Sequence, residues 1–320
     1  MDETVTKSRM PSKSRLVRWI GTLISSGLFL WLLARQDWGQ TWHSLTQAPA
    51  WLLPVVFLLY FSGMVLNSLR WDVLLRAQAV RIPFVEVLKM VLTGAFASNF
   101  LPSTIGGDTV RVVGLTRFKT SWSLSVASVV VDRMLNVVAM VTILPFSLFT
   151  FGNPGALLQN LSFFKAGGTS LAGIVPAGSW AARTLAKLRR WAGRLWEIFQ
   201  IWLRRPGSLA LSFVLAWSSS FIVFFAIWVL ARGLGMPLSL YQVMGVMALT
   251  YLFSLLPISI NGYGVREVAV TTLYMQLGAS LEGASTLAVI TRFMLLLEAL
   301  PGAFWLSQMV ASQDKGEGAV

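Results

Sequence analysis

The chain contains no cysteine and only one histidine, His43, among its 320 residues. The lack of cysteine excludes disulfides and thiolate metal sites, and a lone histidine provides no histidine cluster for metal binding or catalysis. No GxxxxGKS or GxxxxGKT sequence is present, so the phosphate-binding signature of many ATPases is missing as well. No nucleophile–base pair stands out. We therefore expect no metal site, no cofactor and no catalytic residues.

Charged residues are also scarce. They make up 12% of the chain, whereas soluble domains contain about 25%. Hydrophobic residues make up 55%, and the mean hydropathy is +0.68. Apolar runs of about 20 residues recur along most of the sequence, each long enough to cross a hydrocarbon layer of ~30 Å. The composition predicts an all-α polytopic membrane protein.

The net charge of +13 does not indicate nucleic-acid binding, because the basic residues are grouped between apolar runs. Five lie between Lys7 and Arg18, seven between Arg70 and Lys119, and seven between Arg183 and Arg205. Cytoplasmic loops collect lysine and arginine, so these three regions are predicted to share the cytoplasmic side. The first apolar run lacks a small-x-small cleavage site and is read as an uncut span. We expect a bacterial cytoplasmic (inner) membrane protein with both termini in the cytoplasm.

The predicted organisation is a basic tail (1–18), one transmembrane domain (19–310) and a C-terminal tail (311–320). The domain has about six spans and two re-entrant helical hairpins, at 85–119 and 239–277, each of which enters and leaves on one side. Residues 161–181 are only mildly apolar, but a crossing is required there to return the chain to the cytoplasm. The spans are expected at about 19–34, 51–69, 123–149, 161–181, 208–231 and 284–309.

Residues 183–205 form a distinct segment between two spans. Arg183, Lys187, Arg190 and Arg194 fall on one helical face, and leucines and aromatic residues fall on another. This pattern predicts an amphipathic helix on the anionic cytoplasmic leaflet. The alternative is a solvated helix that only connects two spans.

Two segments within the apolar regions resemble each other, LPSTIGGDTVR (101–111) and LPISINGYGVR (256–266). Aligned without a gap, they are identical at six of eleven positions, and corresponding residues are 155 positions apart. The matches include Pro102 with Pro257, Gly107 with Gly262, and Arg111 with Arg266. The same offset superimposes the flanking spans, which run in opposite directions. The chain is therefore predicted to be an inverted repeat of two halves (about 19–149 and 161–309), an architecture that recurs in secondary transporters.

The composition of these segments indicates a binding site. Unwound backbone within a membrane is tolerated only where it is buried in protein or lines a watery cavity. Each proline would end a short helix, the glycines would allow a turn, and a new helix would begin with exposed N–H groups. Helix N-termini and a nearby arginine favour an anion, so Arg111 and Arg266 are predicted to face a common cavity. Asp108 and Glu267 are expected to neutralise these arginines in the empty site.

Other ionisable residues lie inside predicted spans, namely Asp132, Arg133, Arg292 and Glu298. Such residues are functional candidates because each costs at least ~2.5 kcal/mol when unpaired. The alternative is that they form salt bridges that only hold the hairpins in place. Asn261 and Gly262 also form a common tight-turn dipeptide. The GYG string is similar to potassium-channel filters, but Arg266 would repel a cation.

Several motifs together resemble one family of membrane proteins. They are SNFLPSTIGGDTVRVVGL, the acid–arginine pair Asp132–Arg133, and LPISINGYGVRE followed by LEALPG. The family is the flippase-like one named for the transmembrane part of lysylphosphatidylglycerol synthases, and the resemblance covers about residues 15–310. The sequence departs from the family pattern at Ser103, Asn261 and Asp132, which affects the identity of the headgroup more than the fold.

The resemblance implies a set of functional residues. Asn99, Pro102, Gly106, Gly107, Asp108 and Arg111 match the first motif; Pro257, Gly262, Gly264 and Glu267 match the second; Arg133 matches the arginine of the pair. With the residues chosen for charge and position, the predicted substrate-binding set is Asn99, Gly106, Gly107, Asp108, Arg111, Asp132, Arg133, Asn261, Gly262, Gly264, Arg266, Glu267 and Arg292, with Pro102 and Pro257 as helix breaks.

The function implied by the resemblance is movement of lipids, or of lipid-linked headgroups, between leaflets. We expect an anionic phospholipid or a polyprenyl-phosphate-linked lipid as substrate, with its phosphate near Arg111 and Arg266. Transport would be downhill or ion-coupled. Two alternatives remain open, a transporter of a small soluble anion and a non-transporting scaffold for a lipid-modifying enzyme or glycosyltransferase. An enzyme acting on lipids is a more distant one.

Overall fold

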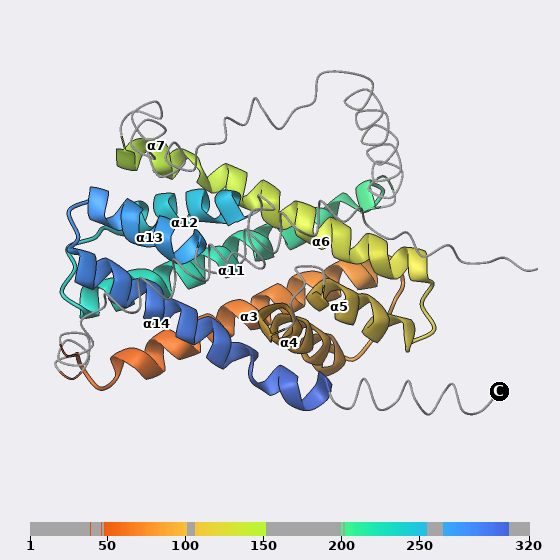
Figure 1. The fold of residues 1–320 in the computed structure, drawn as a ribbon. Helices are drawn as coiled ribbons and strands as arrows, with labels where there is room; N and C mark the ends of the chain where they lie inside the picture. The colour runs from red at the N-terminus through yellow and green to blue at the C-terminus, as the bar shows by residue number, and fades with distance from the viewer. Residues whose placement is uncertain are drawn as a thin grey trace, which may run out of the picture.

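The computed structural model describes residues 39, 46, 48–100, 106–151, 200, 202–254 and 265–306. All its regular elements in this part of the chain are α-helices (Figure 1). In chain order they are α3 (Leu52–Ala77), α4 (Phe84–Phe100), α5 (Gly106–Thr116), α6 (Trp122–Ile143), α7 (Pro145–Phe151), α11 (Pro206–Gly233), α12 (Leu240–Ser254), α13 (Val265–Gln276) and α14 (Leu281–Ala299).

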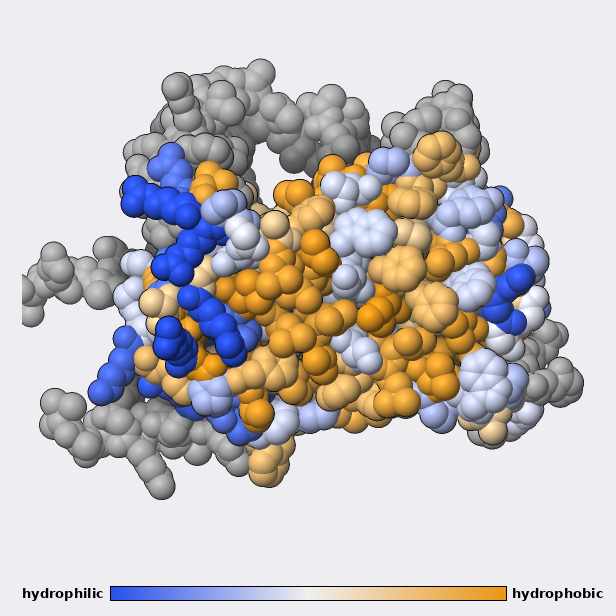
Figure 2. Space-filling model, turned by 180° about the vertical axis from the view of Figure 1, so that it is seen from behind, coloured by the Kyte–Doolittle hydropathy of each residue, from blue (hydrophilic) through white to orange (hydrophobic). Residues whose placement is uncertain are grey.

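Four helical stretches are long and apolar enough to cross a membrane, which confirms the prediction of an all-helical membrane protein. They are Leu52–Ala77, Trp122–Phe151, Pro206–Gly233 and Leu281–Leu306. All four run lengthwise through the molecule (Figure 1). An apolar surface covers the middle of the face in Figure 2, and most of the strongly hydrophilic residues on that face gather at one end.

Local signals explain where several helices begin. Ser121 and Ser280 cap α6 and α14, because each hydroxyl accepts a hydrogen bond from a backbone N–H three residues later, at 3.3 Å and 3.0 Å. Pro206 begins α11 and Pro145 begins α7, at positions where the missing N–H has no helical partner to lose.

The helix bounds differ from two of the predicted spans. The span expected at 51–69 continues through Arg70 to Ala77, because the charge of Arg70 is neutralised inside the protein. The span expected at 123–149 is divided into α6 and α7 at Leu144, before Pro145. The segments 19–34 and 161–181 lie outside the described residues, and of the segment 183–205 only residues 200 and 202–205 are described.

The centre of the fold is an antiparallel pair of helices, α3 and α11 (Figure 1). A Cβ atom on Gly63 of α3 would lie 2.7 Å from Val223 Cγ2, in the middle of α11. A Cβ on Gly233, at the end of α11, would lie 2.7 Å from Leu52 Cδ1, at the start of α3. The start of one helix therefore meets the end of the other.

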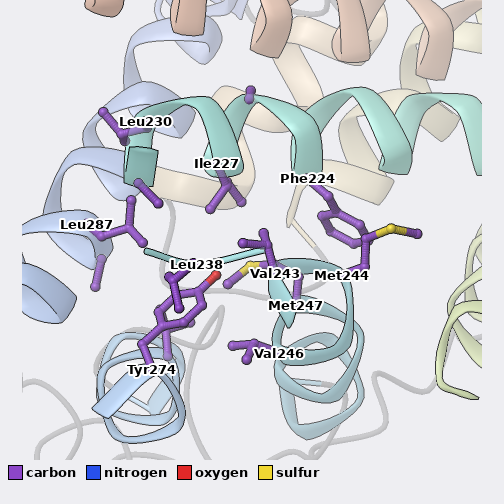
Figure 3. Packing of buried hydrophobic residues seen from close by; sticks show 14 of the residues in the cluster. Phe224, Ile227, Leu230, Leu238, Val243, Met244, Val246, Met247, Tyr274 and Leu287 are labelled. Atoms are coloured by element: carbon purple, nitrogen blue, oxygen red, sulfur yellow. The ribbon is translucent and has the colours of Figure 1, made fainter. Parts of the chain in front are cut away.

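The largest apolar cluster surrounds α11. Phe224, Ile227 and Leu230 of α11 pack against residues of α12, α13 and α14 (Figure 3). Tyr274 reaches from α13 into this cluster, and Leu287 joins it from α14 (Figure 3). These contacts fix α12 and α13 against the spanning helices.

The remaining helices are held by close backbone approaches. On α5, a Cβ atom at Gly107 would overlap the Gly94 carbonyl oxygen and Ser98 Oγ of α4. Ser147 of α7 lies against α12, where a Cβ on Gly245 would be 2.8 Å from Ser147 Cα. Gly302, beyond α14, lies against α4, where its Cβ would be 2.8 Å from the backbone nitrogen of Thr93.

Candidate functional site

Asp132 of α6 is bound by two arginines from two other helices. Arg70 of α3 donates from Nε to Oδ1 at 2.7 Å, and Arg111 of α5 donates from Nη2 to Oδ2 at 2.9 Å. All three side chains are buried. The carboxylate therefore joins α3, α5 and α6 at one point.

Arg70 is also held by two amide side chains. Its Nη1 donates to Asn136 Oδ1 at 3.1 Å, and its Nη2 donates to Asn67 Oδ1 at 2.6 Å. Asn136 in turn donates from Nδ2 to the Tyr251 hydroxyl at 2.9 Å. Because Tyr251 belongs to α12, this chain of hydrogen bonds connects the cluster with the second half of the sequence.

Arg111 is less completely satisfied than Arg70. Its guanidinium lies over the ring of Trp71, 4.2 Å from the centroid, which is a cation–π contact. Trp71 is fixed by a 3.3 Å hydrogen bond from Nε1 to Ser128 Oγ. Nothing in the described part of the chain accepts a hydrogen bond from Arg111 Nε. A buried donor without an acceptor is unfavourable, so this position suits an incoming acceptor.

The cluster of Arg70, Arg111 and Asp132, called the cationic cluster below, contains two guanidinium groups and one carboxylate. Its formal charge is therefore +1. A buried charge without a counter-ion is costly, and an anion bound next to it reduces that cost. The arrangement suits a phosphate or another oxyanion.

A second ion pair lies beside the cationic cluster. Arg133 of α6 donates to Asp108 of α5 from Nη2 at 2.9 Å and from Nε at 3.1 Å. Asp108 Oδ1 is 3.9 Å from Arg111 Nη1, so Asp108 binds Arg133 much more closely than Arg111. The main counter-ion of Arg111 is therefore Asp132, and not Asp108 as expected from the sequence.

A groove of about 610 Å³ lies between α5 and α6. Its walls are almost entirely apolar, and Asp108 and Arg133 are its charged residues. The side chain of Arg133 is 53% exposed, although it lies in the interior of a membrane-length helix. The groove is lined by Asp108, Thr109, Val112, Trp122, Val126, Val129, Val130, Arg133, Met134, Val137 and Val138.

The second half contains a different set of charges at the start of α13. Glu267 is buried with Arg292 of α14, and the distance from Oε1 to Nε is 3.5 Å. Arg266 has no carboxylate within 4.0 Å among the described residues. Glu267 therefore pairs with Arg292, and not with Arg266 as expected from the sequence.

The structure thus divides the predicted site residues into two groups. Among the described residues, no hydrogen bond or ion pair links Arg111 with Arg266, and the pairs of Arg111 are with Asp108 and Asp132. The amide of Asn99 donates to the Ala95 carbonyl oxygen at 3.0 Å. Gly106 and Gly107 belong to α5, so Gly107 serves close helix packing and not a turn. Pro102, Pro257, Asn261, Gly262 and Gly264 lie outside the described residues.

Sequence reasoning missed Arg70, Asn136 and Tyr251. Arg70 was assigned to the loop after a span, yet Trp71, Leu74 and Leu75 continue the apolar pattern beyond it, which was the available signal. Asn136 and Tyr251 carry no signal in the sequence, because their importance depends on tertiary contacts. Within the described residues, no group of three or more histidine, cysteine, aspartate or glutamate side chains is placed to hold a metal ion.

Comparison with known proteins relates the chain to one family. The model of the lysylphosphatidylglycerol synthase TM region matches residues 18–302. A UPF0104 membrane protein of Archaeoglobus fulgidus is 30% identical over 133 residues, which are 42% of this chain and 40% of that protein. A UPF0104 membrane protein of Pyrococcus horikoshii is 29% identical over 90 residues, or 27% of each chain. The chain thus spans less than half the length of either relative.

Proposed function

The chain belongs to the family of the lysylphosphatidylglycerol synthase TM region, and we propose that it translocates an anionic phospholipid or a polyprenyl-phosphate-linked lipid between the leaflets of the cytoplasmic membrane. The observation that carries the proposal is the cationic cluster beside the groove between α5 and α6. The lipid phosphate would bind Arg111, with its Nε–H as a donor, and the lipid chains would occupy the groove.

The position of the charges supports an anionic ligand. Asp132 and Arg133 lie ten and eleven residues into α6 from Trp122, which is about 15 to 17 Å along the helix. That depth is near the middle of a hydrocarbon layer of ~30 Å. A net positive charge at this depth attracts an oxyanion strongly, because water is scarce there.

The groove supports a lipid over a small soluble anion. A carrier of soluble anions needs a site closed to lipid, whereas a lipid carrier needs a lateral opening through which acyl chains stay in the bilayer. The walls of the groove contain valines, Met134 and Trp122, and Met134 and Trp122 are 38% and 58% exposed. Its volume lies in the usual range for small-molecule sites, about 300 to 1,000 Å³.

The helix bounds support an inverted repeat. Shifting α3 by 155 positions gives 207–232, and α11 spans Pro206–Gly233. Shifting α4 by the same amount gives 239–255, and α12 spans Leu240–Ser254. Equivalent helices of an inverted repeat are antiparallel, as α3 and α11 are.

Two further contacts, one in each half of the chain, support the inverted repeat. Ser147 and Gly302 are 155 positions apart. Ser147 packs on α12 in the second half, and Gly302 packs on α4 in the first half. In this arrangement each half contributes a spanning helix that covers the hairpin of the other, so α4–α5 and α12–α13 would be re-entrant hairpins from opposite faces of the membrane. This architecture is typical of transporters with a site near the midplane.

Substitution of Arg111 tests the function. Replacing it with alanine removes a charge-assisted donor worth about 1.5 to 3 kcal/mol, so movement of a labelled anionic lipid between the leaflets of reconstituted vesicles should slow by roughly ten- to a hundredfold. Arg111→Lys keeps the charge without the planar fork and should slow it less. Arg232→Ala, an exposed arginine at the end of α11, is the matched control.

The effect of Arg111→Ala distinguishes lipid transport from the scaffold and the small-anion carrier. A folded Arg111→Ala variant that moves lipid at the normal rate would rule out a lipid phosphate at the cationic cluster and leave the scaffold alternative. Transport of inorganic phosphate without any movement of lipid would favour the carrier of a small soluble anion.

A further inference from the structure

The carboxylate of Asp108, on α5, lies between two arginines. Its Oδ1 is 2.9 Å from Nη2 of Arg133 on α6 and 3.9 Å from Nη1 of Arg111 on α5. Arg133 also donates from Nε to Asp108 Oδ2 at 3.1 Å, so the pair of these two residues is bidentate. Asp108 therefore binds one arginine closely and stands near a second.

These three side chains form a path from the groove to the cationic cluster. The exposed fraction of the side chain falls from 53% for Arg133 to 25% for Asp108 and 7% for Arg111. Asp108 and Arg133 line the groove. Arg111 is hydrogen-bonded to the buried Asp132 at 2.9 Å. A phosphate that enters through the groove therefore meets Arg133 before it reaches Arg111.

A purely structural role does not account for the pair of Asp108 and Arg133. The helices α5 and α6 are already joined by the buried ion pair of Arg111 with Asp132. Apolar side chains would join the helices at a lower cost, because ionised groups are unfavourable at membrane depth and replacing a buried ion pair with apolar residues is often neutral or stabilising. An arginine that stays half exposed in an apolar groove therefore points to a ligand.

A phosphodiester is able to replace the Asp108 carboxylate on Arg133. Both groups carry one negative charge, and both present two oxygens to the planar guanidinium fork. The displaced carboxylate keeps a counter-ion, because its Oδ1 is already 3.9 Å from Arg111 Nη1. A movement of about 1 Å brings these two atoms to hydrogen-bond distance.

We propose that Asp108 and the lipid phosphate exchange places on Arg133 and Arg111. The inference rests on the proposed function and adds the order in which the phosphate meets the two arginines. In the empty protein Asp108 occupies Arg133, as in the structure. The phosphate first binds Arg133 while Asp108 turns to Arg111. The phosphate then moves on to Arg111, and Asp108 returns to Arg133.

The exchange gives Asp108 a role opposite to that of a residue that binds the lipid. As a competitor it keeps the affinity for the phosphate low, and a transport site must be weak enough for its substrate to leave. Without this carboxylate, Arg133 and Arg111 would hold the phosphate at the same time. Loss of Asp108 should therefore tighten lipid binding, whereas loss of a purely structural ion pair would weaken it.

Lipid binding to the purified full-length protein tests the proposal. Short-chain phosphatidylglycerol and, separately, inorganic phosphate are titrated into the protein in detergent, and calorimetry gives the dissociation constants. Asp108→Asn keeps the size of the side chain and should tighten phosphatidylglycerol binding about tenfold, because a negative charge close to the ligand is removed. Glu86→Gln is the control, since it removes a carboxylate from the Lys89–Glu86 pair outside the groove, and it should leave the binding unchanged.

A second variant keeps the test open if Asp108→Asn does not fold, which thermal unfolding would reveal. Arg133→Gln removes the first arginine on the path and leaves Asp108 with Arg111 as its remaining partner. It should weaken phosphatidylglycerol binding about tenfold. Weaker or unchanged binding by folded Asp108→Asn would overturn the proposal, as would undiminished binding by folded Arg133→Gln.

Measurement of lipid movement in vesicles separates this inference from the proposed function. If the unmodified protein moves labelled phosphatidylglycerol and Asp108→Asn moves it several-fold more slowly despite tighter binding, both stand. If the unmodified protein moves the lipid but Asp108→Asn does not bind it more tightly, the exchange is wrong and the function stands. If the unmodified protein moves no lipid, or binds inorganic phosphate but no phosphatidylglycerol, the proposed function fails.

Discussion

Asp132 is a buried carboxylate that binds two arginines at once. It accepts hydrogen bonds from Arg70 and Arg111, which come from two other helices, at 2.7 and 2.9 Å. Its removal would leave the buried guanidinium of Arg70 without a carboxylate within 4.0 Å among the described residues, and that of Arg111 with only Asp108, 3.9 Å away. Breaking a buried ion pair on one side typically costs about 3 to 5 kcal/mol, which is much more than the net contribution of the intact pair.

Asp132→Asn is therefore expected to reduce the free energy of unfolding by about 3 to 5 kcal/mol. The neutral amide keeps the shape of the side chain but not its charge, so the loss of unfolding free energy is due to the missing charge and not to a change in packing. Glu86→Gln is the control, because the Lys89–Glu86 pair is partly exposed and is worth at most about 1 kcal/mol. Unfolding in mixed micelles with increasing dodecyl sulfate measures both. If both variants lost the same small amount of unfolding free energy, Asp132 would contribute no more to stability than an exposed ion pair does.

At the scale of elements, the α4–α5 pair depends on a glycine contact. Gly107 lies within α5, and its Cα approaches the Gly94 carbonyl oxygen and Ser98 Oγ so closely that no side chain fits. Small residues allow helix backbones to come together in membranes, where packing and not the hydrophobic effect drives association. This contact positions Arg111, which lies one turn further along α5.

We expect Gly107→Ala to separate α4 from α5 and to impair both stability and lipid movement. The added methyl group would meet backbone atoms, which cannot move aside as a flexible side chain would, and overpacking costs typically 1 to 3 kcal/mol. Gly207→Ala is the matched control: Gly207 lies in the first turn of α11, and a Cβ atom there has no neighbour within 4 Å. Unfolding and transport measured for both variants check the prediction. A stable, active Gly107→Ala variant would contradict it.

At the scale of the whole molecule, the charges differ between the two ends. The C-terminal end of α3 and the N-terminal ends of α6 and α11 lie at one end (Figure 1), with exposed Arg81, Arg117, Lys119, Arg204 and Arg205 near them. At the opposite end, the described exposed charges near the helix termini include Arg232 and Glu282. The excess of basic residues predicts that the first end faces the cytoplasm.

The absence of cysteine allows a direct test of this orientation. Arg81→Cys lies between α3 and α4, and Gln276→Cys lies at the end of α13; both positions are exposed. In an inverted repeat a membrane-impermeant maleimide should label Gln276→Cys from outside intact cells and should label Arg81→Cys only after the membrane is opened. Labelling of both positions from the same side would rule out hairpins that enter from opposite faces.

The sequence by itself was sufficient for the class of protein and for its family. Hydropathy is a local property, so the described spanning helices were predicted within a few residues at most of their ends, except where Arg70 and Pro145 altered the pattern. The offset of 155 positions and the presence of Arg111, Asp132 and Arg133 within apolar regions were also visible in the sequence. Hydropathy and single charges within apolar runs depend on residues near one another in the chain, and the offset needs only the comparison of two short segments of sequence.

Only the tertiary structure decided which charges meet. Asp132 and Arg133 were treated as a pair, but neighbouring residues on a helix point in different directions. Asp132 faces the interior and binds Arg70 and Arg111, whereas Arg133 faces the groove and binds Asp108. These partners are 62, 21 and 25 positions away in the sequence. Their distances depend on how α3, α5 and α6 pack, which hydropathy and periodicity do not specify.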